Sequence, residues 1–166
     1  MTRTHTVIAS PVGNLVAVAE DGVLGRLYFE GRRRGPAVPD LGTYVEAGFG
    51  ELRRQLAEYF AGERRDFELP VAAAGDEQQR QVWKLLAEIP YGETRTYGEL
   101  ARQLGDVSLA QAVGAACGAN PVLVVVPCHR VVGAGGRLTG YAGGLERKRF
   151  LLELEEPAEA KEARLF

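Results

Sequence analysis

The stretch VVVPCHRVVG, residues 124–133, sets a cysteine and a histidine side by side after β-branched residues and a proline. The apolar run from Val122 to Val126 predicts a buried strand. Pro127 predicts its end, because proline cannot continue a central strand ladder. Cys128 is therefore expected at a strand end, where reactive groups are common. Arg130 is expected to lower the pKa of this thiol by raising the local positive potential.

The neighbouring histidine needs help to act on the thiol. Adjacent residues of an extended strand point to opposite faces, so His129 requires a turn, or a water molecule, to reach Cys128. A histidine that acts as a base also requires an orienting partner. Three glutamates between positions 153 and 156 of the predicted last helix are candidates. The other cysteine, Cys117, falls on the apolar face of a predicted helix and is expected in the core.

Length and composition narrow the class of protein. The 166 residues suffice for one full core or two small packed domains. A content of 46% hydrophobic and 25% charged residues is ordinary for a globular protein. No apolar run approaches the ~20 residues of a membrane span, and the N-terminus lacks the apolar stretch of a secretory signal. We therefore expect a cytoplasmic monomer with no membrane partner.

Charge and cysteine content exclude further classes. The net charge of −2 does not favour a large phosphate footprint, so any nucleic-acid function has to come from local features. The three arginines of GRRRGPAVPD are expected to be solvated. Two cysteines are too few for a disulfide framework. Together with two histidines they match the spacing of no known zinc finger or ribbon, so no metal site is expected.

The chain divides into two halves of different pattern. The first thirty residues alternate as strands do and are broken by the turn signals PVG and EDG, which predicts an antiparallel meander. From about Tyr44 to Phe60 the apolar spacing is helical. The irregular stretch AGERRDFELPVAAAGDEQ is typical of a linker. We therefore expect an N-terminal α/β domain over residues 1–72 and a C-terminal domain over residues 76–160.

The second half begins with a predicted helix that Asp76 can cap and that carries the apolar stripe Val82, Leu85, Leu86 and Ile89. Thr96-Tyr97-Gly98-Glu99 fits a capping box, a hydroxyl followed three residues later by a glutamate, and predicts a short helix. After a GDVS turn, a second helix is expected from Ser108 to about Gly118. Two short helices joined in this way have the proportions of a helix-turn-helix unit.

This second helix has two unlike faces. The apolar face, expected in the core, carries Leu109, Val113, Ala116 and Cys117. The opposite face is almost bare of bulk and carries Gln111, Gly114, Ala115 and Gly118. A bare face lowers helix propensity but lets another backbone approach closely. That backbone could belong to a nucleic acid or to a neighbouring segment of the same chain.

With its flanks, PCHRVV at residues 127–132 resembles the active-site signature of the O6-alkylguanine-DNA alkyltransferases. The segments IPYGETRTYGELA, AVG, GANP and LTGYAGGLERKRFLLELE follow the order and spacing of that family. The resemblance spans roughly residues 76–156, and the motif with its flanks is specific. The N-terminal part is only loosely similar, mainly in SPVGNLVAVAEDGVL.

The resemblance implies an α+β fold, in which a small antiparallel-sheet domain of ribonuclease H-like type precedes a mostly helical, winged-helix-like domain with a helix-turn-helix. It implies direct-reversal DNA repair. Such a protein binds double-stranded DNA, flips an alkylated guanine out of the stack and moves the O6-alkyl group irreversibly to a cysteine. O4-alkylthymine is a further substrate by analogy only. No cofactor, metal or obligate protein partner is implied.

Individual roles carry over to the matching positions. Cys128 matches the acceptor thiol, His129 the base that works through a water, and Glu155 the carboxylate that orients the histidine. Tyr97 matches the tyrosine that aids base extrusion and protonates the leaving guanine. Asn120 matches the asparagine that braces the turn beside the cysteine.

The substrate and DNA contacts follow in the same way. The residues at substrate-binding positions are Asn120, Val131, Tyr141 and Ala142. Those at DNA-binding positions are Tyr97, Gly98, Asp106, Gln111, Ala112, Gly114 and Ala115. One residue in each of these two sets departs from the family pattern. Ala142 replaces a serine, which leaves only a backbone amide to contact O6, and Gln111 replaces the arginine that fills the gap left by the flipped base. Glutamine has less reach and no charge, so a weaker hold on extruded DNA is expected.

Three other functions stay open at this point. A non-catalytic lesion-binding relative would lack the acceptor cysteine, which this chain has. A helix-turn-helix regulator would need neither the cysteine motif nor the closing loop. A Cys-His hydrolase would draw its histidine from a distant part of the chain, where only His5 is available.

Overall fold

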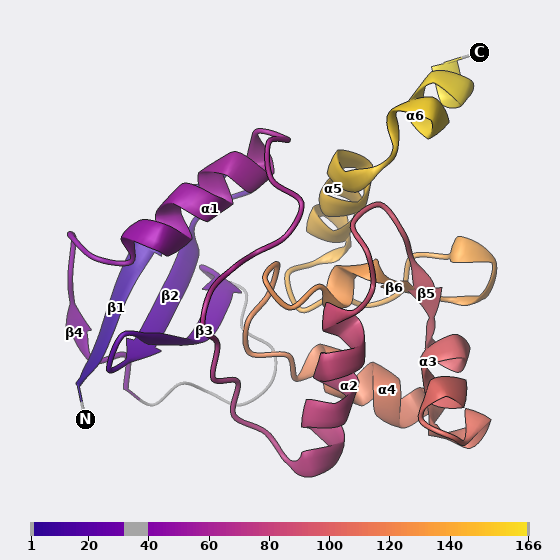
Figure 1. Cartoon of the computed structure of the whole chain (residues 1–166), viewed down its shortest axis with the longest axis horizontal. Coiled ribbons are helices and arrows are strands. Elements are labelled where there is room, and N and C mark those ends of the chain that lie inside the picture. Colours follow the sequence, from indigo (N-terminus) through magenta and orange to yellow (C-terminus); the bar gives the residue numbers. More distant parts are fainter. Residues whose placement is uncertain (1, 32–39, 166) are drawn as a thin grey trace.

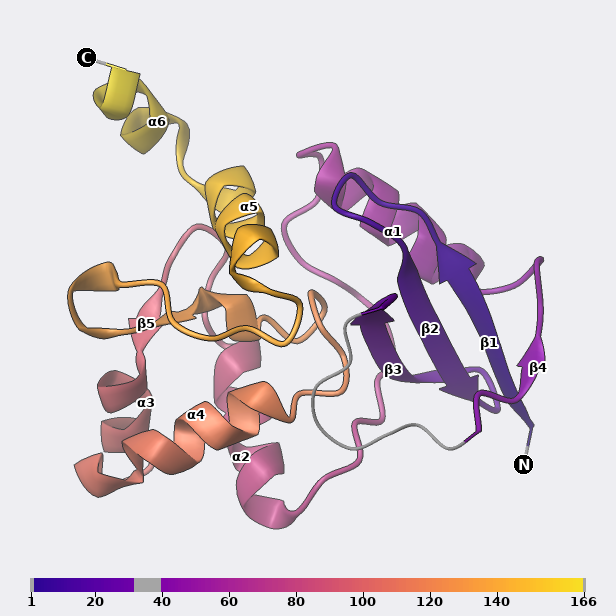
Figure 2. The same cartoon turned by 180° about the vertical axis from the view of Figure 1, so that it is seen from behind.

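The computed structural model describes residues 2–31 and 40–165. A four-stranded sheet with one helix packed on it is followed by a group of short helices (Figure 1 and Figure 2), which confirms the expected α+β class. The three arginines at positions 32 to 34, expected to be solvated, lie outside the described residues. A lipid bilayer could not be spanned by any helix in the described part of the chain.

The N-terminal part consists of β1 (Arg3–Ile8), β2 (Leu15–Glu20), β3 (Val23–Phe29), β4 (Thr43–Tyr44) and α1 (Gly50–Phe60). The sheet order is β3-β2-β1-β4, with β1, β2 and β3 antiparallel and β4 parallel to β1. The tight turn between β2 and β3 uses Asp21 at φ 50° and Gly22 at φ 84°, the left-handed pair that two-residue hairpins favour. The predicted meander is thus confirmed.

Helix α1 begins later than its apolar spacing predicted. The expected start near Tyr44 is wrong, because that residue lies in β4 and the helix begins at Gly50. Gly48 at φ 134° and Phe49 at φ 59° have left-handed backbone that a right-handed helix cannot include. The buried face of α1 consists of Leu52, Gln55, Leu56 and Tyr59.

The C-terminal part consists of α2 (Glu77–Ala87), β5 (Arg95–Thr96), α3 (Tyr97–Gln103), the 3₁₀ turn η1 (Val107–Leu109), α4 (Ala110–Gly118), the 3₁₀ turn η2 (Cys128–Arg130), β6 (Val131–Val132), the 3₁₀ turn η3 (Ala134–Gly136), α5 (Leu145–Glu155) and α6 (Ala158–Leu165). Asp76 caps α2 as predicted, and the predicted capping box of Thr96 with Glu99 opens α3. The second helix of the helix-turn-helix, α4, starts at Ala110 rather than at Ser108, because η1 precedes it.

Trp83 joins α2 to α4. Its side chain is buried, and Nε1 donates a hydrogen bond of 2.8 Å to the carbonyl oxygen of Ala116. Of the predicted apolar stripe of α2, Val82, Leu86 and Ile89 are buried and Leu85 is half-buried. The indole extends this stripe and fixes the back of α4 against α2, which leaves the bare face of α4 turned away from the core.

Residues 122–126 do not form the predicted strand. Val122 makes an isolated bridge to Leu27 of β3, and the chain then turns, with Val124 at φ 71°. The Asn120 side chain holds this turn at both ends, because Nδ2 donates to the Val126 carbonyl at 2.9 Å and Oδ1 accepts from the Val122 amide at 3.0 Å. A β-branched residue at positive φ is strained. Val122, Leu123 and Val124 are buried and Val125 and Val126 are half-buried, so here the apolar run indicated burial rather than extension.

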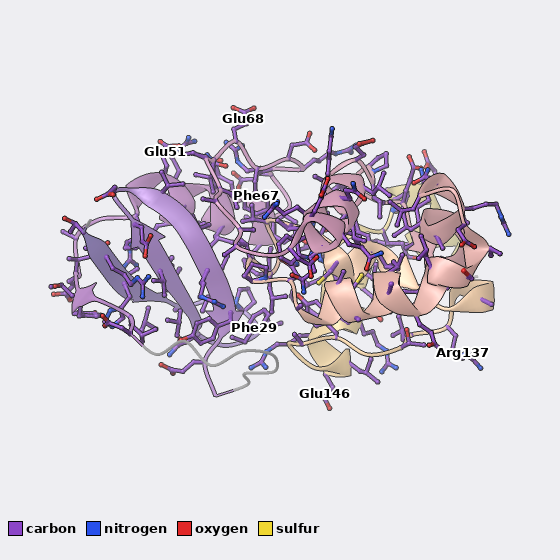
Figure 3. All side chains as sticks on the ribbon, turned by 90° about the horizontal axis from the view of Figure 1, so that it is seen from below. Phe29, Glu51, Phe67, Glu68, Arg137 and Glu146 are labelled. Atoms are coloured by element: carbon purple, nitrogen blue, oxygen red, sulfur yellow. The ribbon has the colours of Figure 1, made fainter. Side chains whose placement is uncertain are left out.

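The turn also connects the two parts of the chain. The Leu27 amide donates to the Pro121 carbonyl at 2.8 Å, and the Leu123 amide donates to the Leu27 carbonyl at 2.9 Å. Phe29, at the end of the same strand, lies where the sheet meets the C-terminal part (Figure 3). The segment that carries the PCHRVV motif is therefore attached directly to the N-terminal sheet.

Substitution Asn120→Ala tests the turn. It removes the partners of two backbone groups, so the free energy of unfolding should fall by about 2 kcal/mol in urea titrations. Asn14→Ala is the control, because Asn14 is exposed and should change stability by less than about 0.5 kcal/mol. Equal losses in the two variants would contradict this account of the turn.

Candidate active site

A cavity of about 490 Å³ opens between the helix-turn-helix and the loop that follows η3. Its lining residues are Tyr97, Ala110, Gln111, Gly114, Cys117, Gly118, Cys128, Thr139, Gly140, Tyr141 and Ala142. Cys128 is only 4% exposed, yet it is part of this lining. The cavity is therefore the side from which Cys128 faces open space, and the rest of the residue is enclosed by protein.

The thiol is not acidic in this structure, contrary to the sequence-based expectation. Burial raises the pKa of Cys128 to about 11, although the Asn120 side chain and the Lys148 charge oppose the rise. Arg130 does not supply the expected positive potential, because its guanidinium is bound to Glu155 and to the Ile89 carbonyl. The predicted strand end is also wrong, since Cys128 opens the 3₁₀ turn η2.

Behind the cysteine lies a buried ionic cluster centred on Glu155. Arg130 donates from Nε to Oε1 at 2.7 Å and from Nη2 to Oε2 at 3.0 Å. His129 Nε2 lies 2.8 Å from Oε2. Burial alone would raise the pKa of Glu155, but the hydrogen bonds from His129 and Arg130, together with the Arg130 charge, outweigh it and lower the pKa. Of the three candidate glutamates, Glu155 is thus the one that meets the histidine.

The cluster determines which nitrogen of His129 carries the proton. Burial lowers the pKa of this imidazole, so the ring is neutral near pH 7 despite Glu155. Because the carboxylate only accepts, Nε2 has to be the protonated nitrogen, and Nδ1 keeps its lone pair. Nδ1 is buried and has no hydrogen-bond partner among the described residues, and the same holds for the Tyr141 hydroxyl. His129 therefore presents an unused basic atom.

Lys148 is a site residue that the sequence analysis missed. It is fully buried on α5, and Nζ donates to the Thr139 carbonyl at 2.9 Å and to the Gly140 carbonyl at 3.4 Å. It thereby holds the loop that lines the cavity and places a positive charge near Cys128. A signal was present, because Lys148 and Glu155 are the two charged residues on the buried face of α5, seven positions apart.

Tyr97 stands on the opposite side of the cavity, at the start of α3. Its hydroxyl lies 2.9 Å from Thr139 Oγ1, and burial raises its pKa, so it holds a proton near pH 7. A Cβ at Gly114 would lie 3.8 Å from the Tyr97 ring, which supports the packing interpretation at that one position. Gln111, Ala115 and Gly118 are exposed, so the remaining bare face of α4 is open to a partner.

The loop carrying Tyr141 and Ala142 is tied to the N-terminal part. Arg147 donates from Nε to the Val12 carbonyl at 2.7 Å, and its guanidinium lies 4.5 Å from the centre of the Phe29 ring. A Cβ at Gly143 would come within 2.7 Å of both Phe29 and Tyr141, so a side chain there would displace the loop. The sequence analysis had no signal for this attachment, because its partners are far apart in the chain.

The structure brings together most, but not all, of the predicted site residues. Those that line the cavity are Tyr97, Gln111, Gly114, Cys128, Tyr141 and Ala142. His129 and Glu155 lie behind it, and Asn120 holds the adjoining turn. The predicted residues outside the lining are Gly98, Asp106, Ala112, Ala115 and Val131. Within residues 2–31 and 40–165, no cluster of histidine, cysteine and carboxylate side chains could hold a metal ion.

Comparisons with known proteins match both parts of the chain to one family. Residues 4–73 match the family model described as the ribonuclease-like domain of 6-O-methylguanine DNA methyltransferase, and residues 77–157 match the DNA binding domain of the same family. The methylated-DNA–protein-cysteine methyltransferase of Methanosarcina acetivorans is 46% identical over 151 residues, which cover 91% of this chain and 97% of the relative. That of Mycobacterium tuberculosis is 44% identical and covers 98% of both chains.

Solved structures show the same likeness. The crystal structure of Mycobacterium tuberculosis OGT in complex with DNA superimposes with a TM-score of 0.87 at 45% identity, covering 92% of each chain.

The raised thiol pKa predicts how Cys128 reacts with iodoacetamide. In a Cys117→Ser background the alkylation rate should rise about tenfold for each pH unit from about pH 7 to about pH 10, because the thiolate fraction rises in that way below the pKa. Peptide mass spectrometry locates the label, and Cys128→Ser should abolish it. A rate that is already maximal near neutral pH would contradict the raised pKa.

Proposed function

This chain belongs to the 6-O-methylguanine DNA methyltransferase family, and from that premise we propose that it repairs DNA by moving the alkyl group of an O6-alkylguanine onto Cys128. One observation carries the proposal to these residues. The Cys128 thiol opens into a cavity between a helix-turn-helix and a loop, and a buried His129–Glu155 pair lies directly behind it. Double-stranded DNA is the partner, and the cytoplasm is the proposed location.

The transfer is a displacement at the alkyl carbon. The sulfur of Cys128 forms a bond to that carbon while the bond from carbon to guanine O6 breaks. The product is a thioether, which has no carbonyl for water to attack, so the thiol is not regenerated. Each molecule therefore repairs one lesion.

Because the resting thiol has a pKa of about 11, the reaction needs a base. The free Nδ1 of neutral His129 takes the thiol proton through a bridging water, while Glu155 holds the Nε2–H. On the other side the Tyr97 hydroxyl gives a proton to the guanine as the alkyl carbon leaves O6, and it regains one afterwards, so that the thiol proton ends, in sum, on the repaired guanine, which stays in the DNA. No cofactor is required by this balance.

The target base has to leave the duplex to reach the sulfur. Extrusion costs a few kcal/mol, and less for a mispaired alkylguanine. The exposed residues of α4 are small enough to lie against the sugar-phosphate backbone in a minor groove, while Gln111 reaches the gap that the base leaves. A cavity of about 490 Å³ is in the range of small-ligand pockets, and the Tyr141–Ala142 loop closes one side of it.

Incubation with an oligonucleotide that contains one O6-methylguanine tests the function. We expect one methyl group on the peptide that holds Cys128, at one equivalent per protein and without turnover, as measured by mass spectrometry. Cys128→Ala should retain DNA binding and lose transfer. Methylation that survives in Cys128→Ala, or binding without any transfer by the unaltered protein, would contradict the proposal and favour a lesion-binding function.

Gln111→Arg tests the departure from the family pattern. Restored charge and reach should raise affinity for lesion DNA and the transfer rate by about three- to tenfold at moderate salt. Gln78→Arg adds the same charge on an exposed residue outside the cavity lining and should change the rate by less than about twofold. Unchanged affinity and rate in Gln111→Arg would show that the glutamine is no handicap.

A further inference from the structure

The N-terminal part reaches the catalytic cluster through one side chain, Tyr59. This residue of α1 is fully buried, and its hydroxyl donates to Glu155 Oε2 at 2.5 Å across 96 positions of sequence. The same oxygen receives His129 Nε2 and Arg130 Nη2. Tyr59 is thus a direct partner of the carboxylate that orients the proposed base.

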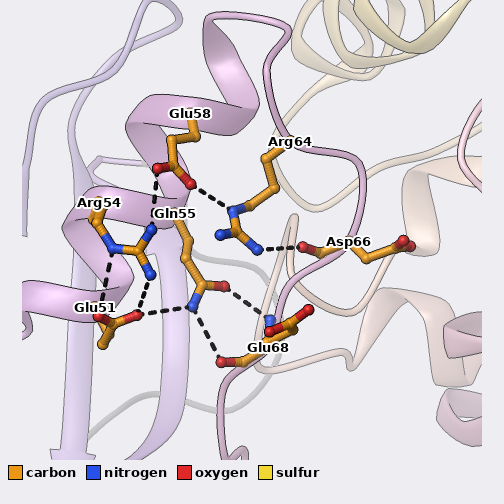
Figure 4. A network of polar contacts seen from close by, with 7 residues as sticks. All are labelled: Glu51, Arg54, Gln55, Glu58, Arg64, Asp66 and Glu68. Atoms are coloured by element: carbon orange, nitrogen blue, oxygen red, sulfur yellow. Dashed lines mark hydrogen bonds and ion pairs between the residues drawn. The ribbon is translucent and has the colours of Figure 1, made fainter.

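The position of Tyr59 is determined by its surroundings. Its ring packs edge-on against Phe60 and Tyr91, with centroids 5.2 Å and 6.4 Å away, and against Phe67 at 5.3 Å. A network of polar contacts joins side chains of α1 to the segment that follows this helix (Figure 4). Gln55, one turn before Tyr59, exchanges two hydrogen bonds with the Glu68 backbone, at 3.1 Å and 2.8 Å.

Further along the same network, Glu58 accepts from Arg64 at 2.8 Å. These contacts hold α1 against the segment after it, which carries Phe67. The Tyr59 hydroxyl therefore reaches Glu155 from a side chain whose position is held by its neighbours.

We propose that Tyr59 is a positioning residue for alkyl transfer, whose hydroxyl disperses the charge on Glu155 Oε2 and so keeps His129 a neutral base with Nδ1 free. This inference rests on the proposed function. Each hydrogen bond donated to a carboxylate weakens its attraction for a further proton. Without the Tyr59 donor, Oε2 would stabilise the protonated imidazolium more strongly, and His129 would become charged at a higher pH.

The other groups around the pair do not replace this donor. Arg130 already spans both oxygens of Glu155, and Tyr91 donates its hydroxyl to the Leu154 carbonyl at 3.2 Å rather than to the carboxylate. Of the other groups near His129, the Tyr141 ring lies 6.4 Å from the imidazole and the Lys148 amine is bound to loop carbonyls. Burial, together with Glu155, raises the pKa of Tyr59, so its hydroxyl keeps its proton and remains a donor across the working pH range.

The test compares Tyr59→Phe with Tyr91→Phe in single-turnover methyl transfer from O6-methylguanine DNA. Both substitutions remove one hydroxyl that donates a hydrogen bond inside the protein, and both keep the aromatic ring. In Tyr59→Phe we expect the acid limb of the pH–rate profile to move up by about half a pH unit, because His129 becomes charged at a higher pH, so that the rate on that limb falls about threefold. Tyr91→Phe should stay within about twofold of the unaltered protein with an unmoved profile.

A second background separates positioning from general stability. In Glu155→Gln the carboxylate is gone, so adding Tyr59→Phe should change the rate no further. An equal loss from Tyr59→Phe in both backgrounds, or an unmoved acid limb, would overturn the inference. Absence of transfer by the unaltered protein would instead overturn the proposed function, so the two failures are distinguishable.

The tautomer of His129 gives a readout that does not depend on the variant folding. Long-range ¹⁵N correlation spectra of the unaltered protein should show His129 protonated at Nε2, and with two histidines in the chain a His5→Gln variant assigns the signals. A proton found on Nδ1 would overturn the proposed arrangement.

Discussion

The buried carboxylate of Glu155 is the interaction on which the rest of the site depends. It accepts from Arg130, His129 and Tyr59, and these donors come from η2 and from α1. An isolated carboxylate in such a place would be neutral or would destabilise the fold. Because its lone pairs are occupied, it stays ionised and imposes one tautomer on His129. The charge therefore holds the cluster together and, in the proposed reaction, also orients the base.

The burial of Cys128 gives the site its chemical character. Cys128 is 4% exposed as a residue, and a thiol with a pKa raised to about 11 is nearly inert toward reagents in water at neutral pH. In the proposed reaction it becomes a nucleophile only when His129 takes its proton through a water and a substrate fills the cavity. The strained turn at Val124, held by Asn120, sets the sulfur in this place. Selectivity thus comes from enclosure, and not from a permanently reactive thiolate.

Local patterns predicted local structure well, and long-range contacts were out of their reach. The capping residues Asp76 and Thr96 marked two helix starts correctly, because each cap is formed by residues three positions apart. The run at residues 122–126 was misjudged, because a side chain before it and a strand 95 positions earlier decide its path. The roles of Cys128 and Glu155 came from resemblance. The Tyr59 contact carries no local signal at all, and the domain boundaries at 72 and 76 stay a prediction.

The contact between Trp83 and Ala116 has a practical consequence. Trp83 is the sole tryptophan of the chain. Its indole donates a hydrogen bond to the carbonyl of Ala116, and the next residue, Cys117, lines the cavity. Tryptophan fluorescence excited at the red edge therefore arises from a single, buried side chain that lies behind α4, the helix that lines part of that cavity. Its emission wavelength and quenching follow events at α4 in real time, without any attached dye.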